Sequence, residues 1–131
     1  MRHLLLVFLL WGVIVSPAQK KLLLKTWEVL EMKGLCLQND SVSLPILKLE
    51  NGKVNGNTSC NRLMGEYELR KNKLIFKNLG GTKMFCSELS NLREQSLFAT
   101  LKEVKFWKIK KTKLYFFDEY SSCVMILKEK K

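Results

Sequence analysis

Residues 59–86 read SCNRLMGEYELRKNKLIFKNLGGTKMFC and decide how the rest of the chain folds. Apolar and polar residues alternate on both sides of a central Lys-Asn pair, a pattern typical of a half-buried β-hairpin. A two-residue loop at that pair sets Leu69 opposite Leu74 and Tyr67 opposite Phe76 on one side. The sequence therefore predicts an antiparallel hairpin with one apolar face.

A second hairpin with the same spacing is predicted further along the chain. Trp107, Ile109, Leu114 and Phe116 repeat the order aromatic, aliphatic, aliphatic, aromatic around a Lys-Thr loop. Trp107 would then pair with Phe116 and Ile109 with Leu114. The two hairpins present matching apolar faces.

Shorter strands are predicted on either side of these hairpins. An Asn-Gly pair at 51–52 is the strongest short hairpin signal and sets Leu49 opposite Val54. The polar segment from Cys36 to Ser43 reads as a loop. Alternating β-favouring residues predict further strands over 26–32, 45–50 and 123–127.

One amphipathic helix is predicted between the hairpins, over residues 91–102. Asn91 suits the N-cap, and Glu94 follows at the spacing of a capping box. An apolar stripe at helical spacing is formed by Leu97, Phe98, Leu101 and Val104. We therefore expect an α+β fold, in which a strongly bent, mostly antiparallel, barrel-like β-sheet of about seven or eight strands packs around one α-helix.

The N-terminus has the order of a secretory signal peptide. A basic start is followed by an apolar run from Leu4 to Val15 and by small residues up to Ala18. The run is shorter than the roughly 20 residues that span a bilayer, so a membrane anchor is disfavoured. We expect a signal peptide over 1–18, cleaved after Ala18, and one exported domain over 19–131, in a periplasm or outside the cell, with no membrane span.

All four cysteines, Cys36, Cys60, Cys86 and Cys123, lie within that domain. An even number in an exported chain of this size indicates disulfides, and four cysteines allow three connectivities. A disulfide between Cys60 and Cys86 would tie together the two ends of the first hairpin. Because no Cys-x-x-Cys is present, a structural role is favoured over a redox role.

The sequence also predicts that the protein is not an enzyme. Its single histidine, His3, would leave with the signal peptide. The mature chain would then lack the commonest general base and the commonest metal ligand. The cysteine spacing lacks the close pairs of a zinc site. We expect no catalytic residues, no cofactor and no bound metal.

The chain is strongly basic, with 23 Lys and Arg against 12 Asp and Glu and a net charge of +11. Such a charge favours anionic partners, such as a lipid head group, an acidic polysaccharide or nucleic acid. A second interpretation is that lysines on outward strand faces keep the sheet soluble. The scattered positions of the lysines favour the second interpretation.

Several short motifs follow one another in a characteristic order. They comprise Thr26-Trp27, residues 45–49, residues 54–56, Cys60-Asn61, Gly65, Tyr67, residues 82–86, Glu94, Phe98 and Leu101. In this order and spacing they resemble the META domain (HslJ-like) family of bacterial envelope and stress-associated proteins, from Leu24 to the C-terminus. Cys60 and Cys86 match the family motifs, which makes them the expected disulfide pair.

The remaining motif positions carry two interpretations. Asn61, Gly65, Thr82 and Met84 would either line a small recognition pocket or provide turn-forming and capping chemistry around the disulfide, and turn chemistry is favoured. The chain departs from the family at Ser59, where glycine is common, and at Phe85, where a small residue is common. Phe85 therefore suggests a larger pocket or a rearranged neighbour. A second disulfide, Cys36–Cys123, is our own inference and would join the end of the first strand to the last.

The outward side of the second hairpin is a candidate binding surface. It carries Phe106, Lys108, Lys110, Lys113, Tyr115 and Phe117. Aromatic rings between lysines can stack on bases or sugars while the ammonium groups neutralise anions. Another interpretation is that a second segment, or the N-terminal leucines, covers this face, and the rarity of large exposed apolar patches favours it.

Three functions follow from these observations. The resemblance implies an exported, non-enzymatic META/HslJ-like envelope protein with a stress-related or binding role, acting on a partner such as an anionic envelope component. The alternative is a cationic binding module for anionic glycan, lipid or nucleic acid, with nucleic acid the least expected. A thiol-based redox enzyme would need a cysteine of low pKa, and the composition argues against it.

Overall fold

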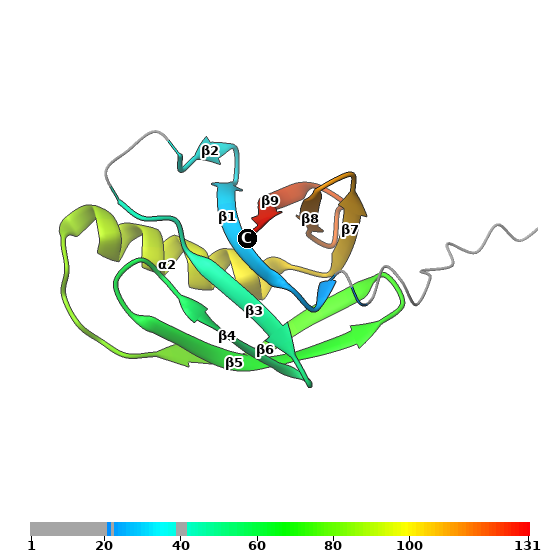
Figure 1. Cartoon of the computed structure of the whole chain (residues 1–131), viewed down its shortest axis with the longest axis horizontal. Helices are drawn as coiled ribbons and strands as arrows, with labels where there is room; N and C mark the ends of the chain where they lie inside the picture. The colour runs from blue at the N-terminus through cyan, green and yellow to red at the C-terminus, as the bar shows by residue number, and fades with distance from the viewer. Residues whose placement is uncertain (1–20, 22, 39–41) are drawn as a thin grey trace, which may run out of the picture.

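The computed structural model describes residues 21, 23–38 and 42–131. The predicted signal peptide and its cleavage site after Ala18 lie outside the described residues. Nine strands and one helix are described within these ranges (Figure 1). In chain order they are β1 (Thr26–Met32), β2 (Leu35–Cys36), β3 (Ile46–Glu50), β4 (Lys53–Asn57), β5 (Arg62–Arg70), β6 (Lys73–Gly81), α2 (Glu88–Glu103), β7 (Phe106–Lys110), β8 (Lys113–Phe117) and β9 (Cys123–Glu129).

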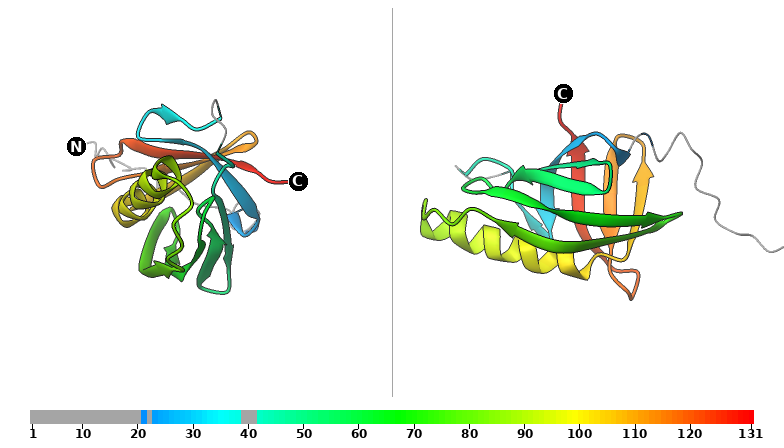
Figure 2. Two further views of the ribbon diagram at one scale, coloured as in Figure 1. Left: turned by 90° about the vertical axis from the view of Figure 1, so that its left-hand side faces the viewer. Right: turned by 90° about the horizontal axis from the view of Figure 1, so that it is seen from below.

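The strands form one antiparallel sheet that returns on itself. The order is β2-β1-β3-β4-β5-β6-β7-β8-β9, and β1 also pairs with β9, so the sheet makes a ring (Figure 2). The ring is weakly joined between β6 and β7, where only Lys73 and Phe106 pair. The predicted α+β fold, a bent antiparallel sheet around one helix, is confirmed, although the sheet is a ring with a weak seam and not a true barrel.

The structure has nine strands among the described residues, against the seven or eight expected. The additional strand is β2, which lies partly in the polar segment predicted to be a loop. Its two residues pair with Glu31 and Met32 at the end of β1. Two residues are too few to show an alternating pattern, which is why the sequence does not reveal this strand.

The predicted hairpin pairs are confirmed. Tyr67 lies opposite Phe76 and Leu69 opposite Leu74 in β5 and β6. The other two hairpins keep their predicted registers, with the pairs Leu49–Val54, Trp107–Phe116 and Ile109–Leu114. Turn chemistry and the buried face act together here, because a slip of one residue would turn every apolar side chain outward.

Helix α2 begins earlier than predicted. Ser87 is the N-cap, and its hydroxyl oxygen accepts a hydrogen bond from the Ser90 N–H at 3.1 Å. The predicted cap at Asn91 is therefore wrong. Glu94 has another role, since its carboxylate accepts a hydrogen bond from the Thr58 hydroxyl at 2.8 Å.

The predicted apolar stripe lies in the core. Leu97, Leu101 and Val104 are fully buried, and Phe98 packs against the core from its edge. The helix contacts β6, β1 and β9 and lies across the open side of the ring (Figure 2). The stripe thus fills the space that the bent sheet leaves. Among the described residues, no helix has both the length and the apolar character needed to cross a membrane.

Leu101→Ala should lower the free energy of unfolding by about 2–5 kcal/mol, because it opens a cavity between helix and sheet. Denaturant unfolding followed by circular dichroism measures this. Leu92→Ala is the matched control, since Leu92 is on the same helix and 61% exposed. The control should change stability by less than about 0.5 kcal/mol. Equal losses in the two variants would contradict the assignment of the stripe to the core.

Candidate functional site

A disulfide joins Cys60 and Cys86, whose Cα atoms are 5.8 Å apart. Cys60 lies in the short loop between β4 and β5, and Cys86 directly precedes the N-cap of α2. The bridge therefore fastens the segment between β6 and α2 to the sheet. This is the connection between hairpin ends that the sequence suggests.

The side-chain amide of Asn61 lies at the centre of the same region and is fully buried. Its Oδ1 accepts hydrogen bonds from the Met84 N–H at 2.7 Å and the Thr82 hydroxyl at 2.9 Å. Its Nδ2 donates to the Met84 carbonyl at 3.0 Å. One side chain thus holds residues 82–84 beside the β4–β5 loop.

Thr58 completes the network from the other side of the loop. Its hydroxyl oxygen accepts hydrogen bonds from the N–H groups of Asn61 at 2.8 Å and Cys60 at 3.3 Å, and its hydroxyl hydrogen goes to Glu94 of α2. Arg62 exchanges hydrogen bonds with Thr82 through its backbone. The polar groups of Asn61 and Thr82 are therefore used within the protein, which is turn-forming chemistry.

Two positions explain why glycine suits this region. Ser59 has φ of 86°, in the left-handed region that favours glycine. Its hydroxyl oxygen is buried, with no hydrogen-bond partner in the described chain. A Cβ on Gly65 would lie 2.8 Å from Leu79 Cδ2 and 3.1 Å from the Lys77 carbonyl oxygen, so a larger residue would displace its neighbours where β5 and β6 shift register. At both positions the constraint is on the backbone: its conformation at Ser59 and its close packing at Gly65.

Met84 contributes its backbone to the network while its side chain is 61% exposed. The neighbouring Phe85 is 74% exposed, so the larger side chain at this position projects outward and is not accommodated in the core. Both residues line an open groove of about 780 Å³ between residues 79–85 and α2.

The helix contributes the second wall of this groove. Asn91, Gln95, Phe98 and Lys102 line it at helical spacing. The helical wall of the groove could not be predicted from the sequence, because the polar side of α2 shows no distinctive pattern. Phe85 is the residue at which the sequence suggests a larger pocket, and it lines this groove.

The inferred Cys36–Cys123 disulfide is wrong, because both cysteines are free and exposed in the structure. Glu31 of β1 pairs with Cys36 on one side and with Ile126 of β9 on the other. Strands β2 and β9 are thus separated by two strand spacings, about 9.5 Å, beyond the 4.4–6.8 Å between the Cα atoms of a disulfide.

The Cys123 thiol does not have the environment of a reactive cysteine. Burial raises the pKa of Cys123, a hydrogen bond to the Met125 carbonyl lowers it, and the Glu31 carboxylate raises it. A nucleophilic thiol needs a lowered pKa. In the part of the chain that the structure describes, no cluster of three or more His, Cys, Asp or Glu side chains is arranged to hold a metal ion.

The structure brings the six predicted surface residues onto the outer side of β7 and β8. Phe106 lies opposite Phe117, Lys108 opposite Tyr115, and Lys110 opposite Lys113. The three lysines are exposed and the three aromatic residues half-buried. Leu23, one of the N-terminal leucines considered as a cover, is buried in the core instead.

Strand β9 widens this surface, which we call the lysine face. It adds Lys128 beside Lys113 and Ile126 beside Tyr115. Figure 2 shows β7, β8 and β9 side by side at one end of the molecule. Among the described residues, Lys108, Lys110 and Lys113 form no ion pair.

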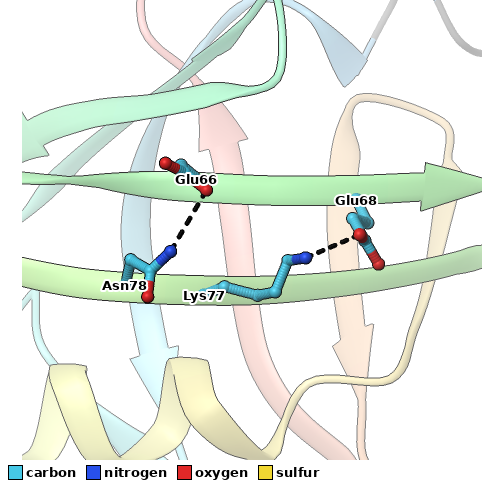
Figure 3. Close-up of polar contacts among 4 residues, drawn as sticks. All are labelled: Glu66, Glu68, Lys77 and Asn78. Atoms are coloured by element: carbon cyan, nitrogen blue, oxygen red, sulfur yellow. Dashed lines mark hydrogen bonds and ion pairs between the residues drawn. The ribbon is translucent and has the colours of Figure 1, made fainter.

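The outer side of β5 and β6 is different, because its carboxylates accept hydrogen bonds from neighbouring side chains (Figure 3). Lys77 donates to Glu68 at 2.6 Å, and Asn78 donates to Glu66 at 3.2 Å. The hydrogen bond and the charge of Lys77 lower the pKa of Glu68. Lys77 thus has a carboxylate partner here, whereas Lys108, Lys110 and Lys113 of the lysine face have none among the described residues.

Comparison with known proteins gives one family and several similar folds. The model of the META domain matches residues 20–131. No curated protein matches. A solved protein from Burkholderia xenovorans is 21% identical, with a TM-score of 0.70 and 92% of each chain covered. A DUF4847 family protein from Bacteroides vulgatus is 10% identical, with a TM-score of 0.62 over 87% of this chain and 98% of that one. At these identities the structures show a shared fold.

Asn61→Ala should lower the free energy of unfolding by roughly 2 kcal/mol, because it leaves the Met84 backbone and the Thr82 hydroxyl without their partners. Thermal denaturation measures the loss. Gln95→Ala removes a comparable amide from the exposed side of α2 and should cost less than about 0.5 kcal/mol. If Asn61→Ala is as stable as the control, the network does not hold this region together.

Proposed function

This chain belongs to the META domain family, and from that premise we propose that it is an exported, non-enzymatic protein of the bacterial cell envelope with a stress-related or binding role. The observation that carries the proposal is the Cys60–Cys86 disulfide at the centre of the family motif. Disulfides persist in oxidising compartments such as the periplasm and the cell exterior. The N-terminal pattern of a signal peptide supports the same location.

A binding role is also supported by the way the motif residues are used. The polar groups of the Asn61 and Thr82 side chains form hydrogen bonds within the protein. The remaining thiol with a shifted pKa, Cys123, is shifted away from reactivity. A rigid protein that binds a partner through its surface is the function best suited to this arrangement.

Exported protein should begin at Gln19 and carry Cys60 and Cys86 in one disulfide. Intact-mass and non-reducing peptide mapping of the envelope fraction measure both features. Replacing both cysteines by serine should lower the free energy of unfolding by roughly 3.5 kcal/mol, from the entropy of the closed loop. The matched control is the double variant Cys36→Ser with Cys123→Ser, which should lose little. Protein retained in the cytoplasm, or free thiols at both positions 60 and 86, would contradict the proposal.

The lysine face favours a second candidate function, a cationic module for anionic glycan, lipid or nucleic acid. Its ammonium groups lack partners within the described chain, while its half-buried rings supply flat apolar surface. Binding of this kind weakens as salt rises, because it depends on neutralising exposed charge. Salt dependence therefore separates it from recognition through an apolar groove.

Changing Lys108, Lys110 and Lys113 to Glu should abolish binding to heparin, to vesicles of anionic lipid and to single-stranded DNA, by reversing the charge of the lysine face. Equilibrium binding at low and high salt measures the effect. A triple control makes the same change in net charge elsewhere, at the exposed Lys53, Arg62 and Lys71. Equal losses in both triple variants would mean that net charge, and not this face, produces the binding.

A further inference from the structure

Most of one backbone edge of β6 pairs with no strand of the described chain. On one side β6 pairs with β5 along its length, but on the other only Lys73 pairs, with Phe106 of β7. The Leu74 N–H reaches the Lys105 carbonyl at 3.0 Å on that second side. Beyond this point the chain enters α2 instead of continuing a strand, so the rest of the edge has no ladder partner in the described chain.

The alternation of an antiparallel ladder identifies the free groups. The backbone N–H and C=O of Leu74 point away from β5. Those of Phe76, two residues further along, therefore point to the same edge. The Thr82 N–H donates to the Arg62 carbonyl at 3.1 Å, and therefore the backbone groups of Gly81 point to the free edge. Exposed edges of this kind accept strands from other chains unless something blocks them.

Helix α2 lies beside this edge and leaves the groove described above between them. Figure 3 shows the helix on the opposite side of β6 from β5. A Cβ on Gly80 would meet nothing within 4 Å, so the groove is open at this point. From Asn91 to Lys102 the helical wall is about 16 Å long, the length of roughly five residues of extended chain.

The lining of the groove selects the chemistry of the occupant. Met84, Phe85 and Phe98 offer apolar contacts. Lys83 and Lys102 also line it, and neither forms an ion pair within the described chain. The one carboxylate among the lining residues is Glu94, so the two lysines leave the groove with a net positive charge.

We propose that this groove binds an extended segment of a partner polypeptide, with apolar and acidic side chains, which adds to the free edge of β6. Such strand addition satisfies backbone groups through the ladder and reads side chains through the walls. An alkyl chain would leave the strand edge without hydrogen bonds, which is costly in an apolar contact. A second copy of this chain would bring another +11 of charge.

The inference gives a partner to the proposed binding role but depends only on the geometry of β6 and α2, so it can be tested apart from export. The probe is a fluorescent peptide of about seven residues that alternates Val with Glu, long enough to span the groove. Fluorescence anisotropy measures its affinity for the chain from residue 19 onward. Two comparison peptides replace Glu by Lys, or carry N-methyl groups on alternate backbone nitrogens.

Variants then locate the binding site. Ala99→Trp fills the groove from an exposed position of α2, and Ser96→Trp places the same side chain at an exposed position that does not line the groove. Ala99→Trp should weaken binding of the acidic peptide at least about tenfold, a difference of roughly 1.4 kcal/mol, while Ser96→Trp retains it. Lys83→Glu combined with Lys102→Glu should have the same effect as Ala99→Trp.

Amide hydrogen exchange supplies the second readout. Bound acidic peptide should slow exchange at Gly81, which lines the groove and whose backbone groups face the free edge. The N-methylated and Lys peptides should bind at least about tenfold more weakly. The proposal is overturned if no acidic peptide binds, if Ala99→Trp has no effect, or if N-methylation leaves the affinity unchanged. It is equally overturned if the groove proves to mediate self-association, seen as a dimer that Ala99→Trp dissociates.

Discussion

The buried amide of Asn61 is the contact on which the rest of the structure depends. It bonds both backbone groups of Met84, so residues 82–84 cannot leave the β4–β5 loop without exposing unsatisfied polar atoms. Helix α2 starts shortly after this anchored segment, and Glu94 is tied to the same loop through Thr58. The disulfide reinforces the arrangement by limiting how far the unfolded chain can spread.

That anchor places the helix across the open side of the sheet. With its start fixed, α2 lies along β6 and directs Leu97 and Leu101 into the core. The helix covers the apolar interior of the ring. Unlike a strand, it offers no backbone hydrogen-bond partner to β6. The free strand edge and the groove are therefore both consequences of closing a ring of strands with a helix.

The sequence predicted the hairpins and the core face of the helix because these follow from periodicity. Registers such as Leu69–Leu74 could be predicted because the position of the turn and the alternation of apolar residues agree. The N-cap was not predicted, because Ser87 and Asn91 are both good capping residues; in the structure Ser87 accepts the bond from the Ser90 N–H, and Glu94 bonds Thr58 instead of closing a capping box. The wrong prediction of a Cys36–Cys123 disulfide has a similar cause. Strands β2 and β9 lie on opposite sides of β1, and the spacing of cysteines in the sequence does not reveal strand order. The groove depends on that same order.

The pairing of β1 with β9 has a consequence for synthesis. The two strands that close the ring come from opposite ends of the described domain, and the Lys130 N–H still bonds the Thr26 carbonyl at 2.8 Å beyond the last strand. Ring closure must therefore wait until the C-terminal residues have left the ribosome, and contacts this distant in sequence form slowly. A nascent chain without β9 lacks one wall of the ring and therefore cannot complete its fold during synthesis.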